Sequence, residues 1–585
     1  MVADEDRREL RIRALGRTGL LSLAVFATAA GLYANSLSGA FVYDDQPIIV
    51  ADPLVRGRAS PAAFFVSSYW QRGEAPSAAR RYWGGLYRPL TVLSYALTWR
   101  LGGGRPLLFH VVNVVLHGLA AVLLFRLICA LGFSVEASFV AAAAFAALPI
   151  HAEAVSWSVG RAELLSAVFV LAAWLLLRAE SSPGKTALGL FCYAAALLSK
   201  ESAAAFPAVL ILGDMFARRG SARELLDRRL LAWLSVFGVL LGYLSWRRAI
   251  LGAALSVGAP YFPTQSRLIV VLTMAKFLFR GWLWPTATGL GLCADYSRPG
   301  FPDAAPTDPA AWAALAAAVG AAVWAVRAFR SRRSAAGFAV LVFFCLAAPL
   351  SNLLVQMEIL GAERIMYLPS IGFCLLIAAG WDFWTRRGRA ADPRPKAAAA
   401  ACLLWWSAAT VARNRIWRSD AALFASMAAS APDNARALIG LGTAADEAGR
   451  HAEARRYYAK VLETEPDLHR ALYDMGRSYY EEGDWRSAAV WFRKLDGAAA
   501  DDDTLCFLGL IAEREGRVRE ALEYYARVLE RDPTDLEARR DLGLLLFKTG
   551  RAPESIRQLR LYLDGGPPEA DAAEIRRFLK ELGAG

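Results

Sequence analysis

The stretch LGLIAEREGRVREALEYY, from Leu508 to Tyr525, occurs four times in related form in the last quarter of the chain. Its counterparts are LGTAADEAGRHAEARRYY from residue 441, MGRSYYEEGDWRSAAVWF from residue 475 and LGLLLFKTGRAPESIRQL from residue 542. Alignment of the four copies brings small residues into register at three positions, with spacings of 34, 33 and 34 residues. The three sets are Gly442, Gly476, Gly509 and Gly543; Gly449, Gly483, Gly516 and Gly550; and Ala454, Ala488, Ala521 and Ser555.

A constant period of this length with small residues at fixed places is the tetratricopeptide pattern. Small residues let the two antiparallel helices of one repeat pack closely, and stacked pairs form a superhelix with a concave groove. We therefore predict an α-solenoid of about four repeats over residues 417–585, with a groove that suits a protein partner.

Residues 1–416 have a different composition, and they raise the hydrophobic share of the whole chain to 56%. They contain runs such as VVNVVLHGLAAVLLFRLI (111–128) and LLSAVFVLAAWLLL (164–177). A bilayer core about 30 Å thick needs roughly 20 apolar helical residues to cross it. Many such runs in series predict a polytopic transmembrane helical bundle, so the expected fold class is all-α throughout.

Twelve apolar stretches are candidate crossings: residues 15–34, 109–129, 136–150, 163–178, 186–198, 203–217, 229–250, 266–285, 309–328, 336–355, 365–383 and 396–413. With a cytoplasmic N-terminus, residues 35–108 form an extracytoplasmic loop. Twelve crossings would place the basic loops RAFRSRR (327–333) and RRGRAADPRPK (386–396) outside, whereas basic loops favour the cytoplasm. We therefore predict eleven crossings, with a broken or re-entrant segment between residues 229 and 308, and the repeats on the extracytoplasmic side.

The net charge of +12 does not indicate a nucleic-acid partner, because the basic residues cluster in loops between apolar runs. The seven cysteines are scattered and form no CxxC pair. Neither a disulfide framework nor a zinc site is predicted from them.

Charged side chains at membrane depth cost about 2.5–3.5 kcal/mol each on insertion scales. Several polar residues nevertheless fall at the outer ends of the predicted helices. They are Asp44 and Asp45; Arg88; His110, Asn113 and His117; His151 and Glu153; Arg161 and Glu163; Lys200 and Glu201; and Glu363, Arg364 and Tyr367. Their common side of the membrane indicates a site built from many helix ends.

Each of these residues also has a purely structural interpretation. The pairs Arg161–Glu163, Lys200–Glu201 and Glu363–Arg364 could be local ion pairs, or side chains that snorkel to the membrane interface. The histidines could bond within the bundle, and Asp44–Asp45 could form a turn or a helix cap. The case for function rests on the coincidence of all of them on one side.

Several longer motifs carry a resemblance to a known family. They are NSLSGAFVYDDQPI (35–48), YRPLTVLSYALTWRLGG (87–103), FHVVNVVLH (109–117), LPIHAEAVSWSVGRAELL (148–165), LLSKES (197–202), AERIMYLPSIGF (362–373) and RNRIWRSDAALF (413–424). In this order, followed by repeats, the chain resembles the transmembrane and tetratricopeptide-repeat O-mannosyltransferases of the GT-C superfamily. One departure is that it has fewer repeats than animal members carry, which puts the acceptor in doubt more than the chemistry.

The resemblance implies an inverting membrane glycosyltransferase. Its donor would be a hexose, such as mannose, on a polyprenyl phosphate, and its acceptor a hydroxyl, such as a protein Ser or Thr held by the repeat groove. Asp44 and Asp45 occupy the place of the family's catalytic acidic pair, with Asp44 as base and Asp45 as its orienting partner or as an acceptor for a sugar hydroxyl, or the reverse. The cations Arg88, Arg161, Lys200 and Arg364, with His110 or His151, would hold the phosphate. No cofactor or divalent metal is indicated, and the setting would be a bacterial inner membrane or, in a eukaryote, the endoplasmic reticulum.

Two other function classes fit parts of the sequence. A non-catalytic scaffold would use the repeats to bind a partner and the bundle as an anchor, although one helix would suffice for that purpose. A transporter of lipid-linked sugars would show charges near the bilayer midplane and symmetry between halves, and neither is clear here.

Overall fold

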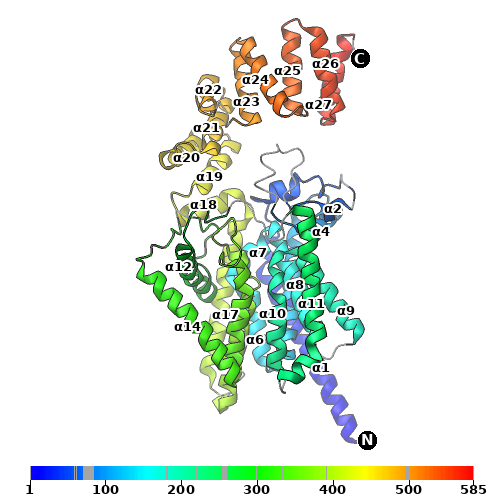
Figure 1. The fold of residues 1–585 in the computed structure, drawn as a ribbon, viewed down its shortest axis with the longest axis vertical. Helices are drawn as coiled ribbons and strands as arrows, with labels where there is room; N and C mark the ends of the chain where they lie inside the picture. Colours follow the sequence, from blue (N-terminus) through cyan, green and yellow to red (C-terminus); the bar gives the residue numbers. More distant parts are fainter. Residues whose placement is uncertain are drawn as a thin grey trace. The chain divides into compact units, whose positions relative to one another are not determined.

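Figure 1 shows a computed structural model of the chain. It describes residues 2–57, 60, 62–69, 85–178, 182–217, 222–252, 260–297, 300–332, 334–389, 392–495 and 500–583. Throughout these residues the regular elements are helices, which confirms the all-α fold class. Contacts within the chain divide it into two compact units, Met1–Ala431 and Pro432–Gly585, so the first unit extends past residue 416.

The first unit is a bundle of apolar helices (Figure 1). Its longer helices are α1 (Val2–Leu32), α4 (Pro89–Gly102), α5 (Pro106–Ala130), α6 (Val135–Ala147), α8 (Arg161–Leu177), α9 (Pro183–Ser199), α10 (Phe206–Ala217), α11 (Ala222–Leu251), α12 (Arg267–Phe277), α14 (Pro309–Arg332), α15 (Ala335–Ala347), α16 (Ser370–Trp384) and α17 (Pro393–Asn414). The alanine-rich α6 packs against α1, α5, α16 and α17. Its buried alanines occupy little space, so neighbouring backbones approach closely.

Six helical stretches of this unit are long and apolar enough to cross a membrane, judged on the described residues. They are Gly16–Ser36, Pro106–Ala130, Ser158–Leu177, Arg223–Leu251, Arg267–Thr288 and Pro309–Ser331. A seventh is the pair Val135–Ala147 and Pro149–Ser156, which is bent by 49°. Among the described residues a sharp bend lies within residues 135–156, whereas residues 267–288 stay helical, with a π-helical turn at Leu278–Leu283. The expected break between residues 229 and 308 stays a prediction, because residues 253–259 lie outside the described part. The count of eleven crossings stays a prediction.

Several short helical turns of this unit pack against α7 (Ala152–Ser156). They are η3 (Pro149–His151), η4 (Ser158–Gly160), η8 (Glu363–Met366) and η10 (Arg415–Arg418), while η5 (Glu201–Ala205) packs against α8, α9 and α10. Each lies beside an end of a longer helix. Segments distant in the sequence therefore meet where the polar motifs are found.

The second unit consists of helix pairs joined by tight turns, as the repeats predict (Figure 1). The pairs are α19 (Ala435–Glu447) with α20 (His451–Thr464), α21 (His469–Glu482) with α22 (Trp485–Arg493), α23 (Asp502–Arg514) with α24 (Val518–Arg531), and α25 (Leu536–Lys548) with α26 (Ala552–Asp564). A last helix, α27 (Glu569–Glu581), packs against α26.

The two glycine positions of the repeat have different physical causes. At Gly509 an added Cβ would lie 2.6 Å from the ring of Tyr525, so only glycine lets α23 and α24 approach this closely. At Gly516 the backbone has a φ of +75°, which glycine adopts without steric cost in the turn between the same helices.

Candidate active site

Asp45 connects the loop after α1 to η4, the turn that precedes α8. Its side chain is fully buried, and its Oδ2 accepts a hydrogen bond from the backbone N–H of Val42 at 3.0 Å. Its Oδ1 accepts one from the N–H of Val159 at 2.9 Å. Burial raises the pKa of Asp45 to about 8, against the opposing effect of these two N–H donors. Asp44, by contrast, is half-buried, and its backbone carbonyl accepts from Ile48.

Three ion pairs lie beside this turn and join different helix ends. Arg88 donates to Glu201 from Nε at 3.0 Å and from Nη2 at 2.5 Å. The others are Lys200 with Glu163, and Arg364 with Glu153, which also accepts from the backbone N–H of Arg364 at 2.8 Å. Each pair connects residues more than 30 positions apart, so the cluster is a product of the fold.

The three pairs and Asp44 form one electrostatic cluster. The charge of Glu163 acts on Arg88 as well as on its partner Lys200. Burial would lower the pKa of Arg364, but Glu153 raises it, with smaller contributions from Glu163 and Asp44. Arg88, Glu153, Glu163, Lys200, Glu201 and Arg364 therefore lie together as three ion pairs, and Asp44 lies close enough to act on Arg364. Their role as one site stays a prediction.

Only part of this cluster reaches the surface. The side chains of Arg364 and Glu201 are 27% and 28% exposed, and that of Arg88 is 12% exposed. Lys200 and Glu163 are buried beneath them. A ligand arriving from outside would meet Arg364 and Glu201 first, and Arg88 is less exposed than either.

Arg161 lies apart from that exposed surface. It is wholly buried and donates to Asn113 Oδ1 at 2.9 Å, Thr98 Oγ1 at 2.7 Å and the carbonyl of Phe109 at 3.1 Å. Its guanidinium also lies 5.0 Å over the ring of Tyr95. Through these contacts Arg161, the first residue of α8, holds α8 against α4 and α5.

The histidines are likewise bound within the bundle. His151 contacts the carbonyl of Phe145 and Ser370 Oγ, both at 2.9 Å, and His110 contacts the carbonyl of Gly39 at 3.2 Å. His117 Nδ1 lies 2.7 Å from Tyr367 Oη, which fixes the residue that follows η8.

The local ion pairs considered from sequence are wrong. Glu363 accepts from Arg413 at 2.7 and 3.3 Å, and in the described part of the chain none of the three expected pairs forms between its own members. The reason is geometric, because residues one or two positions apart on a helix point in different directions.

Two supporting aromatic residues were missed in the sequence. Trp157 lies 5.1 Å beneath the guanidinium of Arg364, and Tyr69 lies 5.0 Å from that of Arg88. An aromatic face attracts a cation through its quadrupole, so both rings orient the arginines. For Trp157 the available signal was its place inside the LPIHAEAVSW motif.

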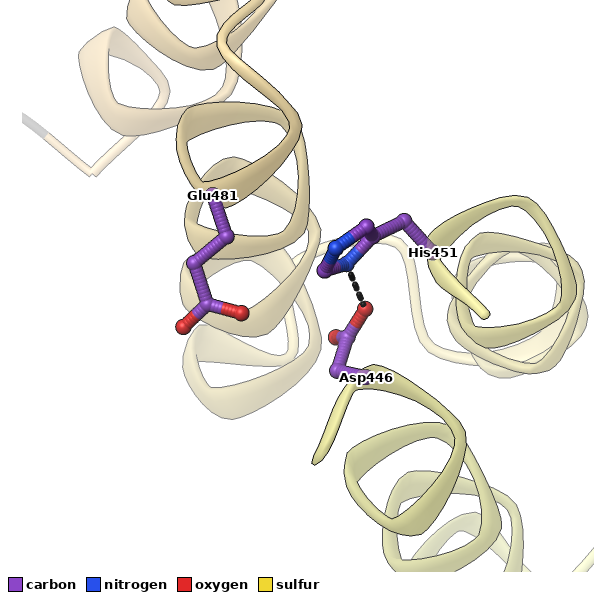
Figure 2. Close-up of side chains that lie close together, drawn as sticks. All are labelled: Asp446, His451 and Glu481. Carbon is purple, nitrogen blue, oxygen red and sulfur yellow. Dashed lines mark hydrogen bonds and ion pairs between the residues drawn. The ribbon is translucent and has the colours of Figure 1, made fainter. Parts of the chain in front are cut away.

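A second polar group lies in the repeats. Figure 2 shows Asp446, His451 and Glu481, whose ligand-type atoms fall within 4.8 Å of one another. Asp446 accepts from Ser478 at 2.7 Å, lies 2.9 Å from His451 Nδ1 and accepts from Tyr458 at 2.9 Å. These hydrogen bonds occupy both carboxylate oxygens of Asp446. The group therefore connects α19, α20 and α21 through hydrogen bonds.

Comparison with known proteins finds relatives along most of the chain. Tetratricopeptide repeat models match residues 418–468, 445–505 and 508–580. Protein O-mannosyl-transferase TMTC3 of Mus musculus is 26% identical over 594 residues, covering 90% of this chain and 62% of that protein. The chain is a homologue of the protein O-mannosyl-transferases. The resemblance predicted from its motifs is confirmed.

Other O-mannosyl-transferases match similarly. TMTC1 of Homo sapiens is 27% identical over 544 residues, covering 80% of this chain and 58% of that protein. Tmtc3 of Drosophila melanogaster is 27% identical over 643 residues, covering 94% of this chain and 68% of that protein. The homologue described here thus spans about three fifths of the length of the mouse and human relatives.

Among solved structures, the chain matches the tetratricopeptide protein YrrB, with 23% identity and a TM-score of 0.23. The match covers 27% of this chain and 84% of YrrB. MamA matches with 19% identity and the same TM-score, covering 26% of this chain and 87% of MamA.

Proposed function

We propose that the protein is an inverting membrane glycosyltransferase of the GT-C type. It would move mannose or another hexose from a polyprenyl phosphate to a Ser or Thr hydroxyl of a protein on the extracytoplasmic side. The observation that carries this proposal is that Arg364, paired with Glu153, lies over Trp157, whose Nε1 donates to Val42 in the turn that leads to the half-buried Asp44. The proposal is also supported by the relatives, which are named protein O-mannosyl-transferases.

The reaction needs a base at the acceptor hydroxyl. Asp44 is the more accessible acid of the pair, so it takes the hydroxyl proton as the oxygen attacks the anomeric carbon. The bond from that carbon to the phosphate oxygen breaks, and its electron pair leaves with the phosphate. A single displacement of this kind inverts the anomeric configuration.

Asp45 has a different part in this proposal. Both of its oxygens already accept backbone N–H bonds, so it holds the turn on which Asp44 sits. The leaving phosphate needs cations more than a proton donor, because it is stable as an anion. Arg88 and Arg364 reach the surface and would bind it, while Lys200 adds positive charge from beneath.

Arginine suits this task because its planar guanidinium pairs with phosphate through two hydrogen bonds. Arg88 and Arg364 supply positive charge of the kind that a divalent metal provides in other transferases, so the proposal includes no metal. The acceptor protein would be held by the repeat groove, as stacked repeats present an extended concave surface.

The test is transfer by the full-length protein in lipid vesicles, with polyprenyl-phosphate mannose as donor and a Ser/Thr-rich protein as acceptor. Mass spectrometry of the acceptor measures the product. Asp44→Asn should lower the rate by about 10²–10⁴-fold, the usual contribution of a positioned base. Asp52→Asn is the matched control, because Asp52 binds the N–H of Leu54 in the same outer loop.

Equal rates for Asp44→Asn and wild type would contradict the proposal. A wild-type protein that binds a partner through its repeats but transfers no sugar would support the scaffold instead. Uptake of the lipid-linked sugar without transfer would support a carrier.

A further inference from the structure

The residue immediately before the acidic pair has a strained backbone. Tyr43 has a φ of +53°, and among the described residues only Asn352 shares such a value without being glycine. A bulky L-residue rarely adopts this conformation, and it persists only where neighbouring groups hold it. The orientation of Asp44 therefore depends on whatever holds Tyr43.

That support comes from helix α18 (Asp420–Ser430), nearly 380 residues later in the chain. The backbone N–H of Tyr43 donates to Asp420 Oδ1 at 2.8 Å. The ring of Tyr43 lies 6.0 Å from the ring of Phe424 in an edge-to-face arrangement. Asp420 and Phe424 are four residues apart, so one face of α18 holds both the backbone and the ring of Tyr43.

Residues 417 and 418, just before α18, also contact the loop that contains Tyr43 or its neighbours. The carbonyl of Arg418 accepts from the N–H of Ala40 at 3.0 Å. Trp417 stacks on Trp157, with ring centroids 5.4 Å apart. Trp157 in turn donates from Nε1 to the carbonyl of Val42 at 3.1 Å, and it lies beneath Arg364.

We propose that Asp420 is a positioning residue for the transfer reaction, acting through Tyr43 on Asp44. This inference rests on the proposed function of the Asp44 turn. Helix α18 belongs to the compact unit that ends at Ala431, yet the tetratricopeptide match already begins at residue 418. Helix α18, where the repeat match begins, therefore helps to position the catalytic turn. A displacement of α18 would move Asp44, the proposed base.

The first test compares substitutions of Asp420 in the full-length protein. Asp420→Ala removes the acceptor of the Tyr43 N–H, so kcat should fall about tenfold, with a smaller change in KM for the donor. Asp420→Asn keeps an oxygen at this position and should stay within about threefold of wild type. Asp420→Ser, whose side chain is too short to reach, should behave like Asp420→Ala and serves as a second variant if the alanine protein folds poorly.

The second test removes the strain itself. Glycine adopts a positive φ freely, so in a Tyr43→Gly background the loss from Asp420→Ala should shrink to less than about threefold. Equal losses in the wild-type and Tyr43→Gly backgrounds would overturn the proposal, because Asp420 would then act in some other way. The double variant also lacks the strained residue, so it should fold even where Asp420→Ala does not.

A third measurement is independent of sugar transfer. Hydrogen exchange of the peptide covering residues 40–48 should speed up in Asp420→Ala and Asp420→Ser but not in Asp420→Asn. Unchanged exchange in the alanine and serine variants would overturn the positioning role even in an inactive protein. Absence of transfer by wild type, with faster exchange in these variants, would instead count against the proposed function and leave the contact supported.

Discussion

Arg88 and Glu201 form a two-bond ion pair, with Nε to Oε2 at 3.0 Å and Nη2 to Oε1 at 2.5 Å. The pair joins the start of α4 to η5, at the surface of the charged cluster. Burial alone would raise the pKa of Glu201, but the neighbouring Arg88 charge and its hydrogen bonds lower it to about 2. The pair therefore links the stability of this end of the bundle to pH.

The first prediction concerns acid stability. Because the pKa of Glu201 is lower in the folded state, its contribution to stability is present above about pH 4.5 and is lost as the pH falls toward 2. Glu201→Gln should lower Tm at pH 7 and flatten its decline between pH 5 and pH 3, measured by thermal unfolding in detergent. Glu136→Gln is the control, because Arg17 and Glu136 form an exposed pair that should contribute little. An unaltered slope for Glu201→Gln would contradict this prediction.

The second prediction separates two arginines that look alike in the sequence. Arg161 is wholly buried and donates to Asn113, Thr98 and the carbonyls of Phe109 and Ser94, so Arg161→Lys should leave at least one buried acceptor atom unsatisfied and cost about 1–3 kcal/mol. Arg88→Lys retains a charge at the surface and should fold, but transfer should fall about tenfold or more because two-bond phosphate recognition is lost. Size-exclusion profiles, Tm and transfer rates of the two variants check this. A stable but inactive Arg161→Lys would show that Arg161 has a role in the reaction after all.

The third prediction concerns the repeats. Gly509→Ala places a Cβ 2.6 Å from the Tyr525 ring, and overpacking of this kind costs about 1–3 kcal/mol. The thermal transition of the repeat unit should fall by several degrees, measured by circular dichroism or scanning calorimetry of the full chain. Gly320→Ala is the matched control, since a Cβ at that helical position of α14 meets no atom within 4 Å. A repeat unit unchanged by Gly509→Ala would mean that α23 and α24 do not pack this closely.

The fold could be predicted from local patterns because its causes are local. Gly509 and Gly516 recur with the period of the repeat, one for close helix packing and the other for a turn with positive φ. The apolar runs likewise predicted the helices of the bundle. The bend at residues 148–149 was harder to foresee, because the proline-containing turn there closes against η8, which lies more than 200 residues away.

The membership of the charged cluster could be predicted only in part. The sequence indicated that Lys200, Glu163 and Arg364 lie at outer helix ends, and the structure brings them together. The sequence could not indicate which residues form ion pairs with each other. Arg413 and Glu363, for example, form a pair although they lie 50 residues apart on different helices. The contact between Tyr43 and Asp420 could not be predicted either, because no sequence pattern indicates that one residue has a positive φ.

The fourth prediction concerns sidedness, on which the proposed reaction depends. An odd number of crossings places residues 432–583 on the opposite side from the N-terminus, whereas an even number places both on the same side. With eleven crossings, protease added to right-side-out vesicles should digest the repeat unit while an N-terminal tag remains protected. The basic loop at 327–333 should stay protected as well, since positive loops face the cytoplasm. Vesicles in which tag and repeats are digested together would establish an even count. The repeat groove could then not present an acceptor to Asp44 from the extracytoplasmic side.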